Sequence, residues 1–135
     1  MMQIDQSLWI EVLNLDYIEN WIEGVAKEEN KLIGDLTIIL GDDDWLLKYN
    51  QQYLNHDYYT DIITFDYSEQ NIVSGDLLIS VERVIANAKE LSVSREKELN
   101  RVIVHGLLHL CGYGDNTKEK SRIIRKKEDY YLNRL

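Results

Sequence analysis

The sequence predicts an α+β fold in which helices pack on a small mixed sheet. Three short apolar segments rich in β-branched residues, at 36–40, 62–67 and 76–81, are typical of strands. Segments with apolar residues at helical spacing lie around them. Two of the strand segments follow each other with no helix between them, so strands and helices do not simply alternate.

Length and composition indicate one globular domain spanning residues 1–135. Hydrophobic residues make up 44% of the chain and charged residues 29%, values that exclude a disordered polypeptide. A single cysteine excludes an intrachain disulfide. The N-terminus has no basic leader, and no apolar run reaches about 18 residues, so we expect a cytoplasmic protein that does not enter a membrane.

The first half of the chain predicts two helices and one strand. Asp16 is the expected N-cap of a helix that runs to about Glu29. The segment 36–40, LTIIL, is expected to be a buried strand. Acidic residues at 42–44 favour the start of a second helix, because the positive end of the helix dipole attracts carboxylates. The apolar stripe expected in the first helix is Ile18, Trp21, Ile22 and Val25, and the residues that recur at helical spacing in the second are Trp45, Leu46, Tyr49 and Tyr53.

The second half predicts two strands followed by three helices. The strands 62–67 and 76–81 are expected to flank a polar turn at 68–75. A helix from about Glu82 to Leu91 follows, then a helix capped by Ser94 that ends at Cys111, and a last helix capped by Thr117. The expected core side chains of the last two helices are Leu99, Val102, Ile103, Leu110, Ile123, Ile124 and Leu132.

The segment HGLLHLCGYGD at 105–115 predicts a metal site at the end of a helix. Residues four apart share a helix face, so His105 and His109 point the same way, and Asp115 follows within loop reach. Two imidazoles and a carboxylate can hold one zinc, or another divalent metal, and leave a fourth position for water. The alternative is that both histidines only lie on a polar helix face. Cys111 is expected to pack as a small apolar side chain.

The residue after the first histidine argues against peptide hydrolysis. Zinc proteases with the H-E-x-x-H motif carry a general-base glutamate there, whereas this chain has Gly106. Two histidines and a carboxylate also form the ligand set of mononuclear iron oxygenases, so an iron protein remains an open alternative.

Charge is distributed unevenly along the chain. The net charge is −9, but residues 117–135 hold seven basic and three acidic side chains, a balance of +4 that leaves −13 on the rest. The acidic body argues against broad phosphate binding. The last helix either forms a local positive patch beside the metal site or is only a solvated face.

Three segments, TDIITFDY, GDLLIS and HGLLHLCGYGD, together resemble the YbeY family of bacterial rRNA-processing metalloproteins. The resemblance covers residues from about Asn50 to the C-terminus. It implies a small, mostly parallel mixed sheet and a metal site at a helix end. It also implies a zinc-dependent, single-strand-directed endoribonuclease in rRNA maturation and ribosome quality control, with ribosomal RNA, the ribosome or a ribosomal protein as partner.

Two positions depart from the family pattern. Most members carry a third histidine where this chain has Asp115, which is also a competent zinc ligand. Most carry an arginine at the position of Leu54, where a cation would clamp phosphate. Protonated His56 is one candidate substitute for that arginine, and an exposed loop histidine is the simpler interpretation.

The general base is unknown from sequence, and the candidates are Asp76, Asp61 and His56. Asp76 at a strand start can orient a ligand histidine or cap its own turn. Asp61, after Thr60, can line the cleft or only cap a strand. Three functional classes stay open: a metal-dependent endoribonuclease, a ribosome-assembly factor whose metal is structural and whose acidic body meets a basic ribosomal protein, and an iron protein.

Overall fold

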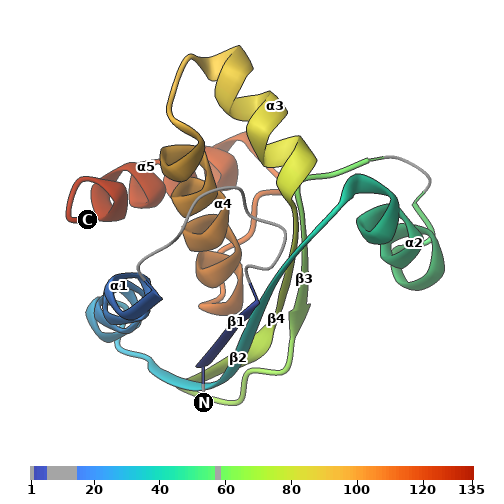
Figure 1. Ribbon diagram of the computed structural model, residues 1–135. Helices are drawn as coiled ribbons and strands as arrows, with labels where there is room; N and C mark the ends of the chain where they lie inside the picture. The colour runs from blue at the N-terminus through green and yellow to red at the C-terminus, as the bar shows by residue number, and fades with distance from the viewer. Residues whose placement is uncertain (1, 6–14, 57–58) are drawn as a thin grey trace.

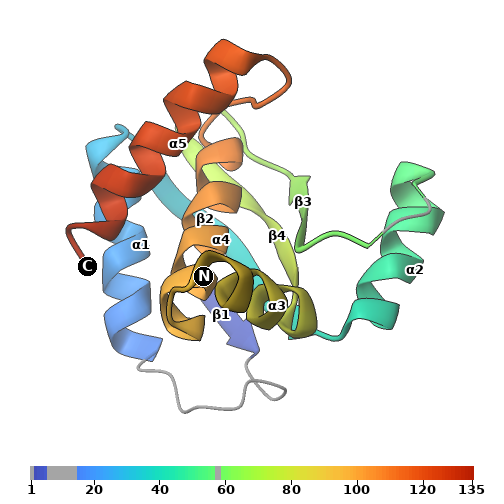
Figure 2. The ribbon, with the colours of Figure 1, turned by 90° about the horizontal axis from the view of Figure 1, so that it is seen from above.

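In the part of the chain that the structure describes, a four-stranded sheet separates a single helix, α2, from the other four helices (Figures 1 and 2). The structure is a computed structural model that describes residues 2–5, 15–56 and 59–135. The strands are β1 (Met2–Asp5), β2 (Leu32–Gly41), β3 (Ile62–Asp66) and β4 (Ile72–Ser80). The helices are α1 (Leu15–Glu28), α2 (Asp43–Leu54), α3 (Val81–Leu91), α4 (Arg95–Leu110) and α5 (Lys118–Leu132).

The sheet has the order β1-β2-β4-β3 and is mixed but mostly parallel, as expected. β1 pairs with β2, and β2 with β4, in parallel, whereas β3 pairs with β4 in antiparallel register. Of these strands, β1 was not predicted, because its four residues give too short a pattern to detect. Within the described parts of the chain, no helix is both long and apolar enough to cross a membrane.

Helix starts follow the predicted capping chemistry in most cases. The side chains of Ser94 and Thr117 accept hydrogen bonds from backbone N–H groups three residues on, which confirms both as N-caps. Asp42 and Ser80 cap α2 and α3 in the same way. The prediction for Asp16 is wrong, since α1 begins at Leu15 and places Asp16 in its first turn, where a carboxylate favours the helix dipole.

The predicted turn at 68–75 is too long, because β4 begins at Ile72. A β-carbon on Gly75 would lie 2.3 Å from the carbonyl oxygen of Phe65 and 2.9 Å from Leu110 Cδ2. Gly75 therefore marks a close approach of β3 and α4 to the middle of a strand and not a turn.

Alternating strand residues divide the core between the two faces of the sheet. Leu77 packs with the main core under α1, α3, α4 and α5, whereas Leu78 packs with a small cluster under α2. All of the core residues predicted in α1 and α4 are confirmed, as is Ile124 of α5. The prediction that Ile123 is a core residue is wrong, because its side chain is 44% exposed and lies one position off the buried face of α5.

Candidate metal centre

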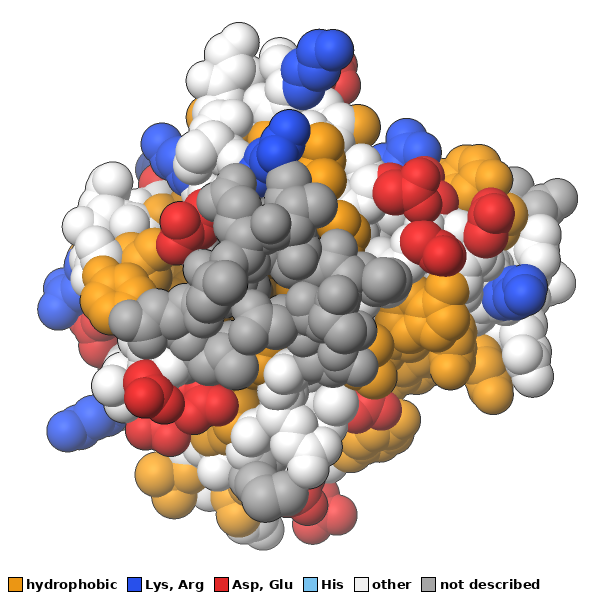
Figure 3. Space-filling view, viewed as in Figure 1, with side chains coloured by type: hydrophobic (Ala, Val, Ile, Leu, Met, Phe, Trp, Pro, Cys, Tyr) orange, Lys and Arg blue, Asp and Glu red, His pale blue; other side chains and the backbone are white. Residues whose placement is uncertain are grey.

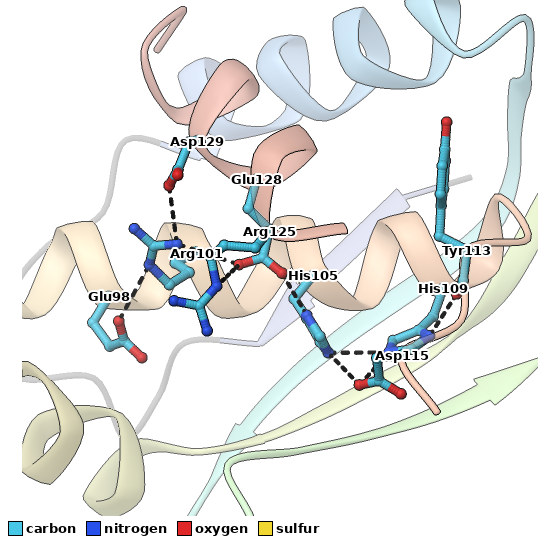
Figure 4. A network of polar contacts seen from close by, with 9 residues as sticks. All are labelled: Glu98, Arg101, His105, His109, Tyr113, Asp115, Arg125, Glu128 and Asp129. Carbon is cyan, nitrogen blue, oxygen red and sulfur yellow. Dashed lines mark hydrogen bonds and ion pairs between the residues drawn. The ribbon is translucent and has the colours of Figure 1, made fainter. Parts of the chain in front are cut away.

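The C-terminal end of α4 brings the two predicted histidines together (Figure 4). The Nε2 atoms of His105 and His109 lie 3.0 Å apart, one helical turn from each other. α4 ends at Leu110, and the left-handed backbone of Gly112, with φ of 108°, turns the chain back. The returning loop places Asp115 Oδ2 3.5 Å from both Nε2 atoms.

The three side chains lie close to the spacing that a tetrahedral metal requires. Zinc bonds to nitrogen and oxygen are about 2.0–2.2 Å long, so ligand atoms in a tetrahedron lie roughly 3.3–3.6 Å apart. Asp115 Oδ2 lies 3.5 Å from each histidine Nε2, within this range, and the two Nε2 atoms, at 3.0 Å, lie a few tenths of an ångström closer together than it. The donor set and its geometry fit a small divalent cation with a fourth position left over.

The second nitrogen of each imidazole has its own partner. Nδ1 of His105 lies 2.6 Å from Glu128 Oε2, and Nδ1 of His109 lies 2.8 Å from the carbonyl oxygen of Tyr113. These acceptors favour a proton on each Nδ1 and leave each Nε2 free to bind metal. Burial works to lower the pKa of His105, but the hydrogen bond and charge of Glu128 raise it above its usual value.

Glu128 is a functional residue that sequence reasoning missed. It is buried on the inner face of α5, between Ile124 and Tyr131 at helical spacing. Its Oε1 atom lies 3.3 Å from Nη1 of Arg101, so its negative charge is compensated. A carboxylate within an apolar helix stripe was the available signal, because such a group is rarely buried unless it has partners.

The acceptor of His109 is itself held by distant residues. The hydroxyl of Tyr113 donates to Glu29 at 2.6 Å, and Tyr131 and Lys127 also donate to this carboxylate. Burial works to raise the pKa of Glu29, but these hydrogen bonds lower it below its usual value. A charged Glu29 at the end of α1 thus fixes the loop that carries Tyr113.

Replacing Glu128 with glutamine should weaken metal binding about tenfold or more, because outer partners of ligand histidines typically contribute 10–100-fold. The amide keeps the volume but loses the charge that holds the proton on His105 Nδ1. Competition with a chromophoric chelator measures this affinity. Asp129→Asn is the matched control, since Asp129 also pairs with Arg101 but is exposed and does not touch His105. Equal weakening in both variants would contradict the role of Glu128.

The histidines form one wall of an open cleft of about 510 Å³. Asp61 lines this cleft and also a neighbouring cavity of about 290 Å³, which His105 borders as well. Burial raises the pKa of Asp61, although the nearby charge of His105 acts against the shift. The remaining cleft residues are Leu54, Thr60, Ile62, Ile63, Thr64, Asp66, His109 and Asp115.

Two of the three general-base candidates do not reach the histidines. Asp76 alternates with Leu77 and so lies on the α2 side of the sheet, where it accepts a hydrogen bond from Tyr67. Asp76 was considered in the sequence analysis as a carboxylate that orients a histidine, but the carboxylate that contacts His105 Nδ1 is Glu128. His56 is exposed after the end of α2 and is absent from the residues that line the cleft, whereas Leu54 does line it.

Cys111 packs at the edge of the main core, as the sequence predicts. Burial raises the pKa of its thiol to about 11, so the group stays protonated and is a poor metal ligand.

Comparison with known proteins identifies relatives of this chain both in sequence and in fold. The family model described as "Endoribonuclease YbeY" matches residues 3–135. A protein of that description from Flavobacterium psychrophilum is 49% identical over 113 residues, which cover 84% of this chain and 81% of the relative. Another, from Bacteroides fragilis, is 48% identical over 83% of this chain and 81% of its own length. The solution structure of TM1509 from Thermotoga maritima superposes with a TM-score of 0.68 at 29% identity, over 98% of this chain and 87% of that one.

Proposed function

Because the chain belongs to the endoribonuclease YbeY family, we propose that it is a zinc-dependent endoribonuclease that cleaves single-stranded RNA in rRNA maturation and ribosome quality control. The observation that supports it most is the convergence of His105, His109 and Asp115 on one point in an open cleft. An extended single strand can enter such a cleft, whereas a duplex presents its phosphates on a wider cylinder.

The proposed chemistry divides between the metal and the protein. A bound divalent ion would polarise a phosphoryl oxygen and lower the pKa of water toward about 7. His105, His109 and Asp115 would hold it, while Glu128 and the carbonyl of Tyr113 keep the imidazoles oriented.

Asp61 is our candidate for the general base. It lies in the cleft with a raised pKa, and a carboxylate that binds a proton more readily accepts one more effectively during the reaction. Its backbone carbonyl accepts a hydrogen bond from the Ser80 N–H, which holds the entry to β3 against the end of β4.

The described residues of the cleft include no side-chain cation that could neutralise the substrate. Among the described residues that line it there is no lysine or arginine, and Leu54 occupies the position where the resemblance implies an arginine. Within the cleft, charge that develops on the phosphate would be stabilised by a bound metal and by hydrogen bonds, and the nearest arginines, Arg101 and Arg125, line the neighbouring cavity.

The decisive experiment incubates the purified protein with single-stranded and duplex RNA of one sequence, with zinc and with chelator. We expect cleavage of the single strand only, abolished by the chelator and restored by zinc. Metal analysis of the untreated protein should give about one zinc per chain. Zinc binding without RNA cleavage would contradict the proposal.

A second candidate function is that of a ribosome-assembly factor whose metal is structural and which binds a basic ribosomal protein. The −13 charge outside residues 117–135 favours a basic protein partner over broad contact with RNA. If a variant that has lost only RNA cleavage still supported normal ribosome assembly, this alternative would be favoured.

Replacing Lys118, Arg122 and Arg125 with glutamine tests whether α5 contacts phosphate. All three are exposed, and at spacings of four and three they share one helix face. Each phosphate contact with a single strand contributes a slope of about −0.7 in log affinity against log salt, so the wild type should show about −2 and the variant near zero. Binding of a short RNA measured at several salt concentrations gives this slope. An unchanged slope would identify the face as merely solvated.

A further inference from the structure

A side cavity adjoins the metal cleft. Asp61, Ile62 and His105 line both hollows, and the other walls of the side cavity come from α3, α4 and α5. Its volume is about 290 Å³, close to the lower limit of about 300 Å³ for pockets that hold small ligands. The side cavity therefore suits a single planar ring better than a longer piece of a nucleic-acid chain.

One buried carboxylate that lines the side cavity lacks a hydrogen bond. Glu98 of α4 is only 4% exposed, and its Oε1 atom has no hydrogen-bond partner within the described part of the chain. The Nε atom of Arg101 approaches this oxygen at 3.8 Å, which is too long for a hydrogen bond (Figure 4). Burial raises the pKa of Glu98, although the charge of Arg101 acts against this shift. Because buried polar atoms are nearly always paired, this oxygen is a ready acceptor for N–H groups of a ligand.

The charges around the side cavity favour an uncharged ligand over a phosphate. Of the described residues that line it, three are carboxylates and two are arginines. One of these arginines, Arg101, already pairs with Glu98, Glu128 and Asp129. On the face that Figure 3 shows, the described basic side chains stand singly and form no continuous patch. A nucleobase carries no charge, and its flat faces can pack against apolar side chains of the lining such as Val102.

We propose that the side cavity binds the base of the nucleotide whose phosphate lies at the metal centre, and that Glu98 selects guanine there. This inference rests on the proposed function. Guanine presents two adjacent donors, N1–H and the 2-amino group, which one carboxylate can accept as a pair, whereas uracil has no amino group. Bases of single-stranded RNA can turn out of the strand and be recognised by hydrogen bonds on this edge.

The test is titration of the full-length, metal-loaded protein with guanosine, inosine and uridine 5′-monophosphate and with ribose 5-phosphate, followed by nuclear magnetic resonance. The inosine nucleotide is the guanosine nucleotide without its 2-amino group, and ribose 5-phosphate has no base. Wild type should bind the guanosine nucleotide about tenfold more tightly than the inosine nucleotide, because a paired contact of this kind discriminates by about that factor. The uridine nucleotide should bind most weakly of the three nucleotides.

Two variants test where the base binds, and a third is the matched control. Glu98→Gln places an amide N–H group opposite the donors of guanine, so the guanosine nucleotide should lose about tenfold in affinity and bind no better than the inosine nucleotide. Ser121→Trp fills the side cavity from an exposed position on α5 and should reduce guanosine binding to that of ribose 5-phosphate. Glu96→Gln makes the same change at an exposed residue of α4 that is not among the described residues of the lining, and should bind as wild type does.

Equal binding of the guanosine and inosine nucleotides by wild type would overturn the proposal, as would a guanosine preference that survives in Glu98→Gln. Circular dichroism verifies that each variant is folded. If Glu98→Gln does not fold, Ser121→Trp decides, because unchanged guanosine binding in that variant would place the base elsewhere.

The outcome is distinguishable from failure of the proposed function, because nucleotide binding is measured without cleavage. If wild type cleaves RNA but does not distinguish guanosine from inosine, only the base site is wrong. If wild type distinguishes them through Glu98 but cleaves no RNA under any metal condition, the endoribonuclease proposal is wrong and the base site remains.

Discussion

Replacing His109 with alanine should remove the metal and reduce RNA cleavage by about a thousandfold or more. The expected size follows from the several kcal/mol that a metal supplies through water activation and charge stabilisation, at about 1.4 kcal/mol for each tenfold change. His109 supplies one of only three converging ligand atoms, and no other described histidine, cysteine or carboxylate completes the cluster. Elemental analysis and a cleavage assay on a single-stranded RNA measure the two effects.

Asp115→His is the matched comparison for this variant. An imidazole is a fully adequate zinc ligand, so this change should retain zinc and cleavage, whereas Asp115→Ala should lose affinity by more than the 10–100-fold typical of an outer partner. Wild-type metal content in Asp115→Ala would remove the carboxylate from the proposed ligand set.

Replacing Gly106 with glutamate should unfold the protein and not create a zinc protease, although it writes the H-E-x-x-H motif into the sequence. Gly106 is buried, and a β-carbon there would lie 2.7 Å from Ile62 Cδ1 and 2.9 Å from Leu77 Cδ2. The new carboxylate would enter the apolar interface between α4 and the sheet, away from the metal. An unpaired buried charge together with overpacking costs on the order of 5 kcal/mol, comparable to the whole stability of a small domain.

Circular dichroism during thermal unfolding checks this result, with Gly106→Ala as the control. The methyl group meets only the flexible ends of two side chains, and the gain in helix propensity offsets part of the strain, so this variant should fold and bind metal. A folded Gly106→Glu protein with wild-type thermal stability would show that residue 106 does not face the core.

Local patterns predicted most of the fold, and the failures have physical causes. The helical stripes of α1 and α4 and the caps Ser94 and Thr117 are short-range features that the sequence carries directly. β1 was not predicted in the sequence analysis, and the start of β4 was placed too late, because both features depend on pairing with strands that are remote in sequence. From the sequence, Gly75 looks like a turn residue, and the need for glycine there becomes clear only from the close approach of Phe65 and Leu110.

The candidate site likewise contains residues that local sequence patterns predict and residues that they do not. His105, His109 and Asp115 come from one continuous segment of helix and loop, so their spacing alone predicted their convergence. Glu128 and Glu29 act across 23 and 84 residues of sequence, and nothing in local spacing could bring them to His105 and Tyr113. Asp76 failed as a candidate because the alternation of β4 turns it to the opposite face of the sheet.

The left-handed turn at Gly112 determines which part of the site can tolerate substitution. It separates the rigid part of the proposed ligand set, two histidines on a packed helix, from a third proposed ligand carried by a surface loop whose backbone is already anchored through Tyr113. Residue 115 is 48% exposed at its side chain and contributes little to the core, so it can mutate without disturbing the fold. The fold can therefore accept either histidine or aspartate at this loop position, and within the proposed ligand set this single substitution should shift the preference between softer and harder metals.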